Sequence, residues 1–301
     1  MEHLTQKRVK FDFEVDFSNG GGIQGQDFRL DIAGDDIADE ALAAYIVADM
    51  RLLMVGEVRI LNKTIIAEKH KRTVAPDSAN SPANLIDLSH TIEAGMITYK
   101  GLPAPIICDY LSREASRKIY ALGTEFQIGK IEMVANTGTY LDSPFHRYAD
   151  GKDLAQLDLS TVANLAGVLV PAVNRNERAI TSAAFAGLDI RGKAVLVHTG
   201  WAAHWRTDRY FEGHPFLTAD AATYLADAGA VLVGIDSHNI DDTSTGERPV
   251  HSILLGREIL IVEHLCNLEQ IPVGDFRFYA VPVKVKGFGT FPVRAFVRVA
   301  R

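Results

Sequence analysis

An aspartate and a histidine stand four residues apart in the polar stretch NTGTYLDSPFHRYADGKD, residues 136–153. These are Asp142 and His146, and Pro144 between them stiffens the turn because its ring fixes the backbone angle φ. An aspartate beside a histidine serves in metal binding and in general acid–base catalysis. The same residue types also make ordinary hydrogen-bonded loops, so the spacing predicts either a functional site or a structural turn.

A second group of polar residues follows apolar runs further along the chain. The segment GIDSHNIDDTSTGERPVHSILL, residues 234–255, crosses a polar loop and reaches His251. The run EILIVEHL, residues 258–265, places Glu263 directly after four apolar residues. Because an unpaired buried carboxylate is costly, Glu263 needs a cation, a metal ion or a proton beside it. An ion pair with Arg248 or Arg294 would satisfy it as well as a metal site.

Runs rich in Val, Ile and Leu predict the strands that carry these residues. Helical patterns over residues 181–189 and 218–229 lie between some of the runs. The mixture predicts an α/β domain with a substantial mixed sheet. The predicted strands lie within residues 166–173, 193–201, 230–236, 258–265, 277–287 and 292–299.

Residues 1–71 predict a separate, small α+β unit, whose role the residues do not reveal. The stretch KFDFEVDF, residues 10–17, alternates apolar with charged side chains, as a half-buried strand does. Residues 35–54 show helical spacing with acidic residues in the first turn, and residues 57–66 favour another strand. Residues 72–84 contain two prolines among small polar residues, which is typical of a linker. The larger domain then spans residues 85–301.

The composition argues against several classes of partner. The 301-residue chain has a formal net charge of −7, whereas phosphate recognition needs clustered Lys and Arg, so no nucleic-acid partner is expected. No run approaches the about 20 apolar residues of a membrane span, and the first residues lack the apolar core of a signal peptide. We therefore expect a cytoplasmic protein without a membrane partner. Cys108 and Cys266 lie in apolar surroundings and are expected to be buried, reduced thiols.

Residues 85–301 resemble the cyclase family, which includes bacterial kynurenine formamidase and isatin hydrolase. The resemblance rests on segments in the family's order, from LIDLSHTIEAGM near residue 85 through VLVHTGW and GIDSHNID to the closing AVPVKVKGFGTFPVRAF. It implies a swivelling β/β/α domain with a mixed sheet. It also implies a homo-oligomer, either a dimer or a tetramer.

The family's motif HxGTHxDxPxH corresponds to residues 136–146 of this sequence. The resemblance implies that Asp142 binds the metal and that His146 acts as the acid–base group. It further implies that a later histidine and a later glutamate complete the metal site, and His251 and Glu263 match these two positions.

Two positions of the motif differ from the family. Asn136 and Tyr140 stand where the family has metal-binding histidines. An asparagine carbonyl is a poor zinc ligand, and a tyrosine phenol must first lose its proton. Asp142, His251 and Glu263 remain, and one nitrogen with two carboxylates can hold a single zinc or manganese ion with open positions for water.

The resemblance and the surviving residues together predict an enzyme that hydrolyses a carbon–nitrogen bond. We expect the substrate to be a small molecule, an amide, lactam or ester, as for an arylformamidase. His146 would move the proton, and Tyr140 or Asn136 would donate a hydrogen bond to the developing oxyanion. A second hypothesis is a metal-free enzyme in which Tyr140, His146 and Glu263 catalyse cyclisation, isomerisation or dehydration. A third is a non-catalytic descendant that binds a small molecule.

Overall fold

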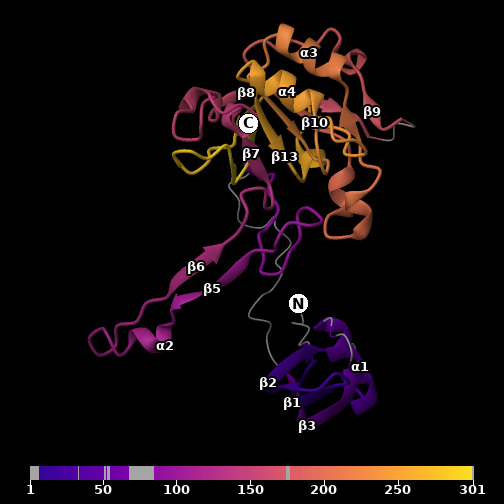
Figure 1. The fold of residues 1–301 in the computed structure, drawn as a ribbon, viewed down its shortest axis with the longest axis vertical. Coiled ribbons are helices and arrows are strands. Elements are labelled where there is room, and N and C mark those ends of the chain that lie inside the picture. Colours follow the sequence, from indigo (N-terminus) through magenta and orange to yellow (C-terminus); the bar gives the residue numbers. More distant parts are fainter. Residues whose placement is uncertain are drawn as a thin grey trace. The chain divides into compact units, whose positions relative to one another are not determined.

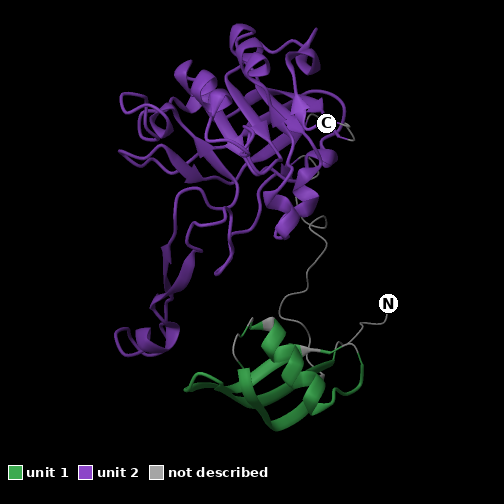
Figure 2. Ribbon diagram, turned by 45° about the vertical axis from the view of Figure 1, so that its right-hand side comes forward, with its two compact units in different colours: residues 1–80 green, residues 81–301 purple. Residues whose placement is uncertain are grey.

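The computed structural model describes residues 7–32, 34–50, 52, 55–67, 85–173 and 177–299. The chain divides into two compact units, residues 1–80 and 81–301 (Figure 2). The predicted linker, residues 72–84, lies outside the described residues, so its character stays a prediction.

The first unit is a three-stranded antiparallel sheet with one helix. Its strands are β1 (Lys7–Phe17), β2 (Gly22–Asp31) and β3 (Val55–Ala67), in the order β2-β1-β3. The alternation predicted for residues 10–17 is confirmed, because Phe11, Phe13 and Val15 are buried while the charged residues between them are not. The sequence analysis did not predict β2.

Helix α1 (Asp39–Asp49) is shorter than the predicted helical region of residues 35–54. Leu42 and Ile46 are fully buried against the sheet, four residues apart on one face. Tyr45 and Met50, which share the predicted helical pattern, are exposed. The apolar face of the helix is therefore narrower than the sequence suggests.

The second unit is built on a nine-stranded mixed sheet, as the α/β prediction required (Figure 1). Strands β8, β10, β12 and β13 run parallel, and the remaining strands pair antiparallel. The sheet order is β15 (Thr290–Pro292), β7 (Tyr140–Asp142), β13 (Leu260–Glu263), β12 (Leu232–Ile235), β10 (Ala194–His198), β8 (Leu165–Pro171), β14 (Phe276–Tyr279), β16 (Phe296–Val299) and β4 (Leu85–Asp87).

The central parallel strands are buried on both faces, which explains their continuous apolar sequences. Val195 and Val197 face a core formed with α3 (Ala219–Asp227) and α4 (Pro249–Gly256). Leu196, between them, faces a second core with Phe278 of β14. Because strands far apart in the sheet share this second core, the sheet curls around it. The second core also contains Leu141 of β7 and packs against Phe291 of the edge strand β15, so it holds both strands in place.

The remaining elements are short. Two small sheets pair β9 (Ala179–Ile180) with β11 (Phe216–Leu217) and β5 (Ile106–Leu111) with β6 (Ile128–Glu132). The β5–β6 hairpin projects from the body of this unit, with helix α2 (Arg113–Ser116) near its tip (Figure 1). Six 3-10 turns complete the described elements: η1 (Pro144–His146), η2 (Leu159–Thr161), η3 (Ser182–Phe185), η4 (Trp201–His204), η5 (Asp208–Phe211) and η6 (Leu268–Gln270).

Two expectations differ from the structure. The predicted helix over residues 181–189 is the single 3-10 turn η3, whereas the predicted helix over residues 218–229 forms as α3. Cys266 is buried as expected, but Cys108 is exposed on β5, because its hairpin is not covered by the rest of the unit. No helix among the described residues is long and apolar enough to cross a membrane.

Candidate functional site

A cavity of about 270 Å³ opens beside strand β7, the neighbour of the edge strand β15. It brings together five of the six site residues predicted from the sequence, although they lie up to 127 positions apart, between Asn136 and Glu263. The cavity is lined by Tyr99, Leu102, Asn136, Tyr140, His146, Arg147, Asn239, Arg248, His251 and Glu263. Asp142, the sixth, is fully buried and contacts His251 and His146.

Strand pairing explains how residues from three segments meet here. Strand β7 lies between β13 and β15 and pairs antiparallel with both. Tyr140 stands directly opposite Glu263 of β13, and Asp142 stands opposite Thr290 of β15. Directly opposed residues of an antiparallel pair are close enough for side-chain contact. The register therefore gives each polar residue of β7 its partner.

The two carboxylate oxygens of Asp142 have different surroundings. The Thr290 hydroxyl donates a short hydrogen bond to Oδ1. Oδ2 is buried and has no hydrogen-bond partner within the described part of the chain, and His251 Nε2 lies 3.8 Å from it. Asp142, His146 and His251 also bring potential metal-ligand atoms within 4.8 Å of one another. A buried carboxylate oxygen without a donor is costly unless a cation accompanies it, so these residues form a candidate metal site.

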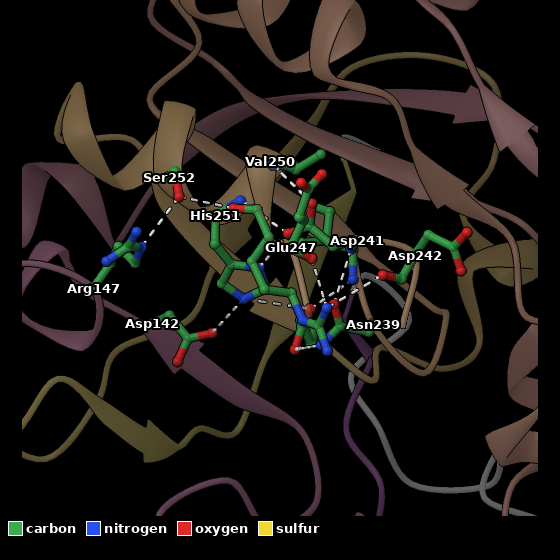
Figure 3. Close-up of polar contacts among 12 residues, drawn as sticks. Asp142, Arg147, Asn239, Asp241, Asp242, Glu247, Val250, His251 and Ser252 are labelled. Atoms are coloured by element: carbon green, nitrogen blue, oxygen red, sulfur yellow. Dashed lines mark hydrogen bonds and ion pairs between the residues drawn. The ribbon is translucent and has the colours of Figure 1, made fainter. Parts of the chain in front are cut away.

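His251 is held in place by Asp241. The imidazole Nδ1 lies 2.6 Å from Asp241 Oδ2, and Figure 3 shows the ring between Asp241 and Asp142. Asp241 also accepts hydrogen bonds from the backbone N–H groups of Val250 and His251 in the first turn of α4. Burial opposes the charged imidazole, but the Asp142 and Asp241 carboxylates outweigh it and raise the pKa of His251 to about 10. The site therefore favours positive charge at Nε2.

Glu263 is fully buried and is surrounded by hydrogen-bond donors. Its Oε2 accepts from the Tyr140 hydroxyl at 2.5 Å and from the Tyr99 hydroxyl at 3.1 Å, with Asn239 Nδ2 at 3.5 Å. Its Oε1 accepts from the backbone N–H of Ile240 at 2.6 Å and lies 3.8 Å from His251 Nε2. Burial raises the pKa of Glu263, although the nearby His251 opposes this shift.

The ion pair considered for Glu263 is not formed. Arg248 donates instead to the backbone carbonyls of Asp242, Thr245 and Glu247. Arg294 pairs with Asp87, on a different part of the sheet. Hydroxyl, amide and backbone N–H groups, and not arginine side chains, therefore contact the buried Glu263 carboxylate.

Tyr99 links the cavity to a buried aromatic cluster. Its hydroxyl lies 2.7 Å from the Tyr140 hydroxyl, accepts from Asn239 Nδ2 at 3.1 Å, and lies 3.3 Å from His264 Nε2. The Nδ1 of His264 lies 2.8 Å from the Tyr210 hydroxyl. Burial and the charge of Glu263 hold the pKa values of Tyr99 and Tyr140 well above the usual value for a phenol. Both side chains therefore keep their protons and can act as donors.

His146 and Asn136 present polar atoms to the cavity. His146 Nδ1 lies 2.8 Å from the Thr290 hydroxyl and 3.8 Å from Asp142 Oδ1, and its side chain is 35% exposed. Asn136 is half-buried and lines the cavity. Its side-chain amide has no hydrogen-bond partner among the described residues. His146 Nε2 and the Asn136 amide are therefore available to a substrate.

Four residues of the site were not given a role by the sequence analysis. Asp241 and Asn239 belong to the polar loop that was noted before His251, so that loop carried a signal. Tyr99 and Thr290 stand in the segments ITYKG and GFGTFPV, where no spacing of acidic, histidine or cysteine residues marks them. Only the pairing of β7 with its neighbours brings Thr290 to Asp142.

Comparisons with known proteins find relatives of this chain in sequence and in structure. The family model described as "Putative cyclase" matches residues 86–242, slightly more than half of the chain. Kynurenine formamidase of Bacillus cereus is 27% identical over 215 residues, covering 71% of this chain and 96% of that enzyme. The match contains the segment from Asn136 to His146.

Solved structures with a similar fold are also found. A protein described as a potential metal-dependent hydrolase with cyclase activity is 27% identical, with a TM-score of 0.59, over 72% of this chain and 98% of its own. Isatin hydrolase A from Labrenzia aggregata has a TM-score of 0.62 and covers 72% of this chain and 94% of its own. Its 18% identity makes that likeness one of fold.

Proposed function

The chain belongs to the cyclase family, and we propose from this premise that it hydrolyses a carbon–nitrogen bond of a small molecule with one divalent metal ion. The observation that carries the proposal is the buried Asp142 Oδ2, which has no hydrogen-bond donor among the described residues and faces His251 Nε2 at 3.8 Å. A carboxylate oxygen and an imidazole nitrogen turned toward one another are a donor set that suits a zinc or manganese ion.

Asp142, His251 and Glu263 would hold the ion. Asp142 would offer Oδ2 and Glu263 would offer Oε1, because Thr290 and the tyrosines already occupy the other oxygen of each carboxylate. Asp241 supports this set, since a carboxylate bound to Nδ1 leaves Nε2 of His251 as the metal-binding nitrogen. When bound, such an ion would lower the pKa of a water molecule and polarise a carbonyl group.

His146 and Asn136 would act directly on the reactants. In hydrolysis, water adds to the carbonyl carbon and the carbon–nitrogen bond breaks. His146 would accept a proton from the water and return it to the departing nitrogen, which needs a proton to leave as an amine. Asn136 would donate a hydrogen bond to the carbonyl oxygen as it gains negative charge. Tyr140 is the less available donor, because its proton is directed at Glu263.

The substrate class follows from the relatives and from the cavity. The name of the Bacillus cereus relative points to a formamide carried by an aromatic amine. A cavity of about 270 Å³ suits a small amide, lactam or ester. Arg147 and Arg248 also line it, and their guanidinium groups favour a substrate with a negatively charged substituent.

Metal analysis and hydrolysis assays test the proposal together. Protein purified without chelator is expected to contain one equivalent of a divalent ion and to hydrolyse an aryl formamide or, as a lactam probe, isatin. Removing the ion with a chelator should abolish turnover, and adding zinc or manganese should restore it. Two equivalents would show that Asn136 and Tyr140 are ligands after all. Full turnover without metal would favour the metal-free acid–base enzyme.

We also propose that the protein is a homo-oligomer, either a dimer or a tetramer. The β5–β6 hairpin supports this, because an isolated two-stranded hairpin is marginal in water and this one exposes large apolar side chains. They are Ile106, Ile107, Tyr110, Ile119, Tyr120, Leu122, Phe126, Ile128 and Ile131. Sedimentation of the native chain and of an Ile107→Glu, Ile131→Asp variant is the test, and the variant should shift toward monomer.

A cytoplasmic location is part of the same proposal. Cys108 is an exposed free thiol, and such thiols persist in a reducing compartment. Cell fractionation tests this, and recovery of the protein in an extracellular or periplasmic fraction would contradict it.

A further inference from the structure

The Thr290 side chain lies between Asp142 and His146, the two charged or titratable residues with which the sequence analysis began. It is the first residue of β15 and is 3% exposed. His146 Nδ1 and Asp142 Oδ1 are 3.8 Å apart, too far for a direct hydrogen bond. The Thr290 hydroxyl bonds to both, through a short contact to Asp142 Oδ1 and at 2.8 Å from His146 Nδ1. One buried hydroxyl therefore bridges the aspartate and the histidine.

The direction of each hydrogen bond in this bridge follows from counting hydrogens. A threonine hydroxyl carries one hydrogen and two lone pairs, whereas an ionised carboxylate can only accept. The hydrogen of Thr290 is therefore donated to Asp142. The bond to His146 must then run the other way, from Nδ1–H to the Thr290 oxygen. This leaves His146 Nε2 without a proton in the neutral imidazole.

A close approach of two backbones puts Thr290 in this position. A side-chain carbon added at Gly289 would lie 2.3 Å from the backbone nitrogen of His146 and 2.5 Å from its Cα. The Gly289 carbonyl accepts a hydrogen bond of 2.7 Å from the backbone N–H of Ser143. Strand β15 is therefore seated directly against the turn that carries His146, and only glycine fits there.

We propose that Thr290 is a positioning residue that holds His146 in its Nδ1–H tautomer and so keeps Nε2 as the proton acceptor. The inference rests on the proposed function for its catalytic consequence, but the tautomer itself does not depend on any substrate. Thr290 also engages Asp142 Oδ1, which leaves Oδ2 as the oxygen turned toward His251. The Thr290 hydroxyl thus binds one oxygen of Asp142 and leaves the other oxygen for the candidate metal site.

Nitrogen NMR of the histidine rings tests the tautomer directly. The full-length chain, with its ten histidines labelled in the ring, is measured metal-free at pH 8, and the His146→Gln variant identifies the signal. The wild-type His146 is expected to show the Nδ1–H pattern. Thr290→Val keeps the shape but removes the hydroxyl, so Nδ1 loses its acceptor and the signal should change to Nε2–H or to a mixture. Thr290→Ser restores a hydroxyl and should restore the pattern.

Steady-state kinetics with the aryl formamide give a second readout. Thr290→Val should lower kcat by about 10–100-fold, the range found for partners of catalytic or metal-binding groups, with KM changed less than about 3-fold. Thr290→Ser should recover most of the activity. Thr199→Val is the matched control, because Thr199 is also buried and donates to a buried aspartate, Asp236, at 2.6 Å, outside the cavity. It should lose stability but keep kcat.

Clear outcomes would overturn the inference. A wild-type His146 with Nε2–H, or a Thr290→Val variant with an unchanged pattern, would show that the hydroxyl does not set the tautomer. Equal losses of kcat in Thr290→Val and Thr199→Val would show a merely structural role. If no tested amide is hydrolysed while the NMR result holds, the proposed function fails and the role of Thr290 stands.

Discussion

Two buried carboxylates, Asp142 and Glu263, stand on neighbouring strands, and their surroundings are opposite. Asp142 Oδ2 has no donor among the described residues and faces His251. Glu263 Oε2 is contacted by the hydroxyls of Tyr140 and Tyr99 and by the amide of Asn239. Asp142 Oδ2 is therefore arranged for a cation, whereas Glu263 Oε2 is already satisfied by hydrogen-bond donors.

The difference shows what the change from histidine to Tyr140 does to the site. A neutral imidazole at this position could bind a metal ion through its lone pair, but a protonated phenol donates a hydrogen bond. Burial and Glu263 keep the pKa of Tyr140 high, so it remains a donor. The Oε2 side of Glu263 is thereby closed with hydrogen bonds and forms the closed half of the site. Asp142 Oδ2 and Glu263 Oε1, each 3.8 Å from His251 Nε2, form the open half, which stays available for one ion.

The largest effect is expected at the open half. Asp142→Asn replaces the unpartnered oxygen with a neutral amide, so metal affinity should fall by more than the about 100-fold typical of supporting residues. Turnover should fall at least as much, and equilibrium dialysis with elemental analysis measures the ion. Asp236→Asn, at a buried aspartate whose donors are Thr199 and Gly200, is the control and should keep the ion. Retention of the ion by Asp142→Asn would show that Asp142 is not the carboxylate that binds it.

His146→Ala is expected to be the next largest change. It removes the group that moves the proton, so turnover should drop by about 10²–10⁴-fold. The ion should remain bound, because Asp142, His251 and Glu263 are the proposed ligands and His146 Nδ1 is engaged by Thr290. Loss of the ion in this variant would instead place His146 among the ligands, as its distance from Asp142 and His251 also permits.

Tyr140→Phe tests the closed half. It removes the donor 2.5 Å from Glu263, which orients a proposed metal ligand, so the rate should fall by about 10–100-fold. Tyr99→Phe should have a smaller effect, since its contact with Glu263 is 3.1 Å. Both variants should keep one equivalent of metal. If Tyr140→Phe abolishes metal binding, the tyrosine is a ligand and the contrast between the two carboxylates is wrong.

The smallest effect is expected from separating the two units. Both carboxylates belong to the second unit, so removal of the first should leave their behaviour unchanged. Limited proteolysis is expected to cut first within residues 72–84 and to leave a folded fragment beginning near residue 80. Activity of the cleaved protein, compared with that of the intact chain, measures the effect. Cleavage elsewhere, with residues 72–84 resistant, would mean that the two units share one core.

Much of the fold could be predicted because its signals are local. The apolar runs of β10, β12 and β13 appear in the sequence as continuous Val, Ile and Leu, since these strands are covered on both faces. The predicted α/β class and cyclase-family fold are confirmed. The short strands β7 and β15 were missed, because three residues show no periodicity and their pairing partners lie far away in the sequence.

The order of the amino acids limits which chemical groups the site can contain. It shows the spacing of Asp142 and His146 and the glutamate within an apolar run. The family resemblance implies that Asn136 and Tyr140 replace two histidines. These features are types of side chain at fixed positions, and they limit the site to few metal ligands and one candidate base. The family resemblance added their order along the fold.

The packing of the folded strands sets which oxygen or nitrogen atom each of these groups presents to the site. Asp142 divides its oxygens between Thr290 and His251, and Glu263 is held by Tyr140, because β7 lies in register between β13 and β15. Such contacts join residues more than 100 positions apart, so no local pattern encodes them. They depend on the strand order of a curled sheet, which forms only when the two cores on its faces are packed.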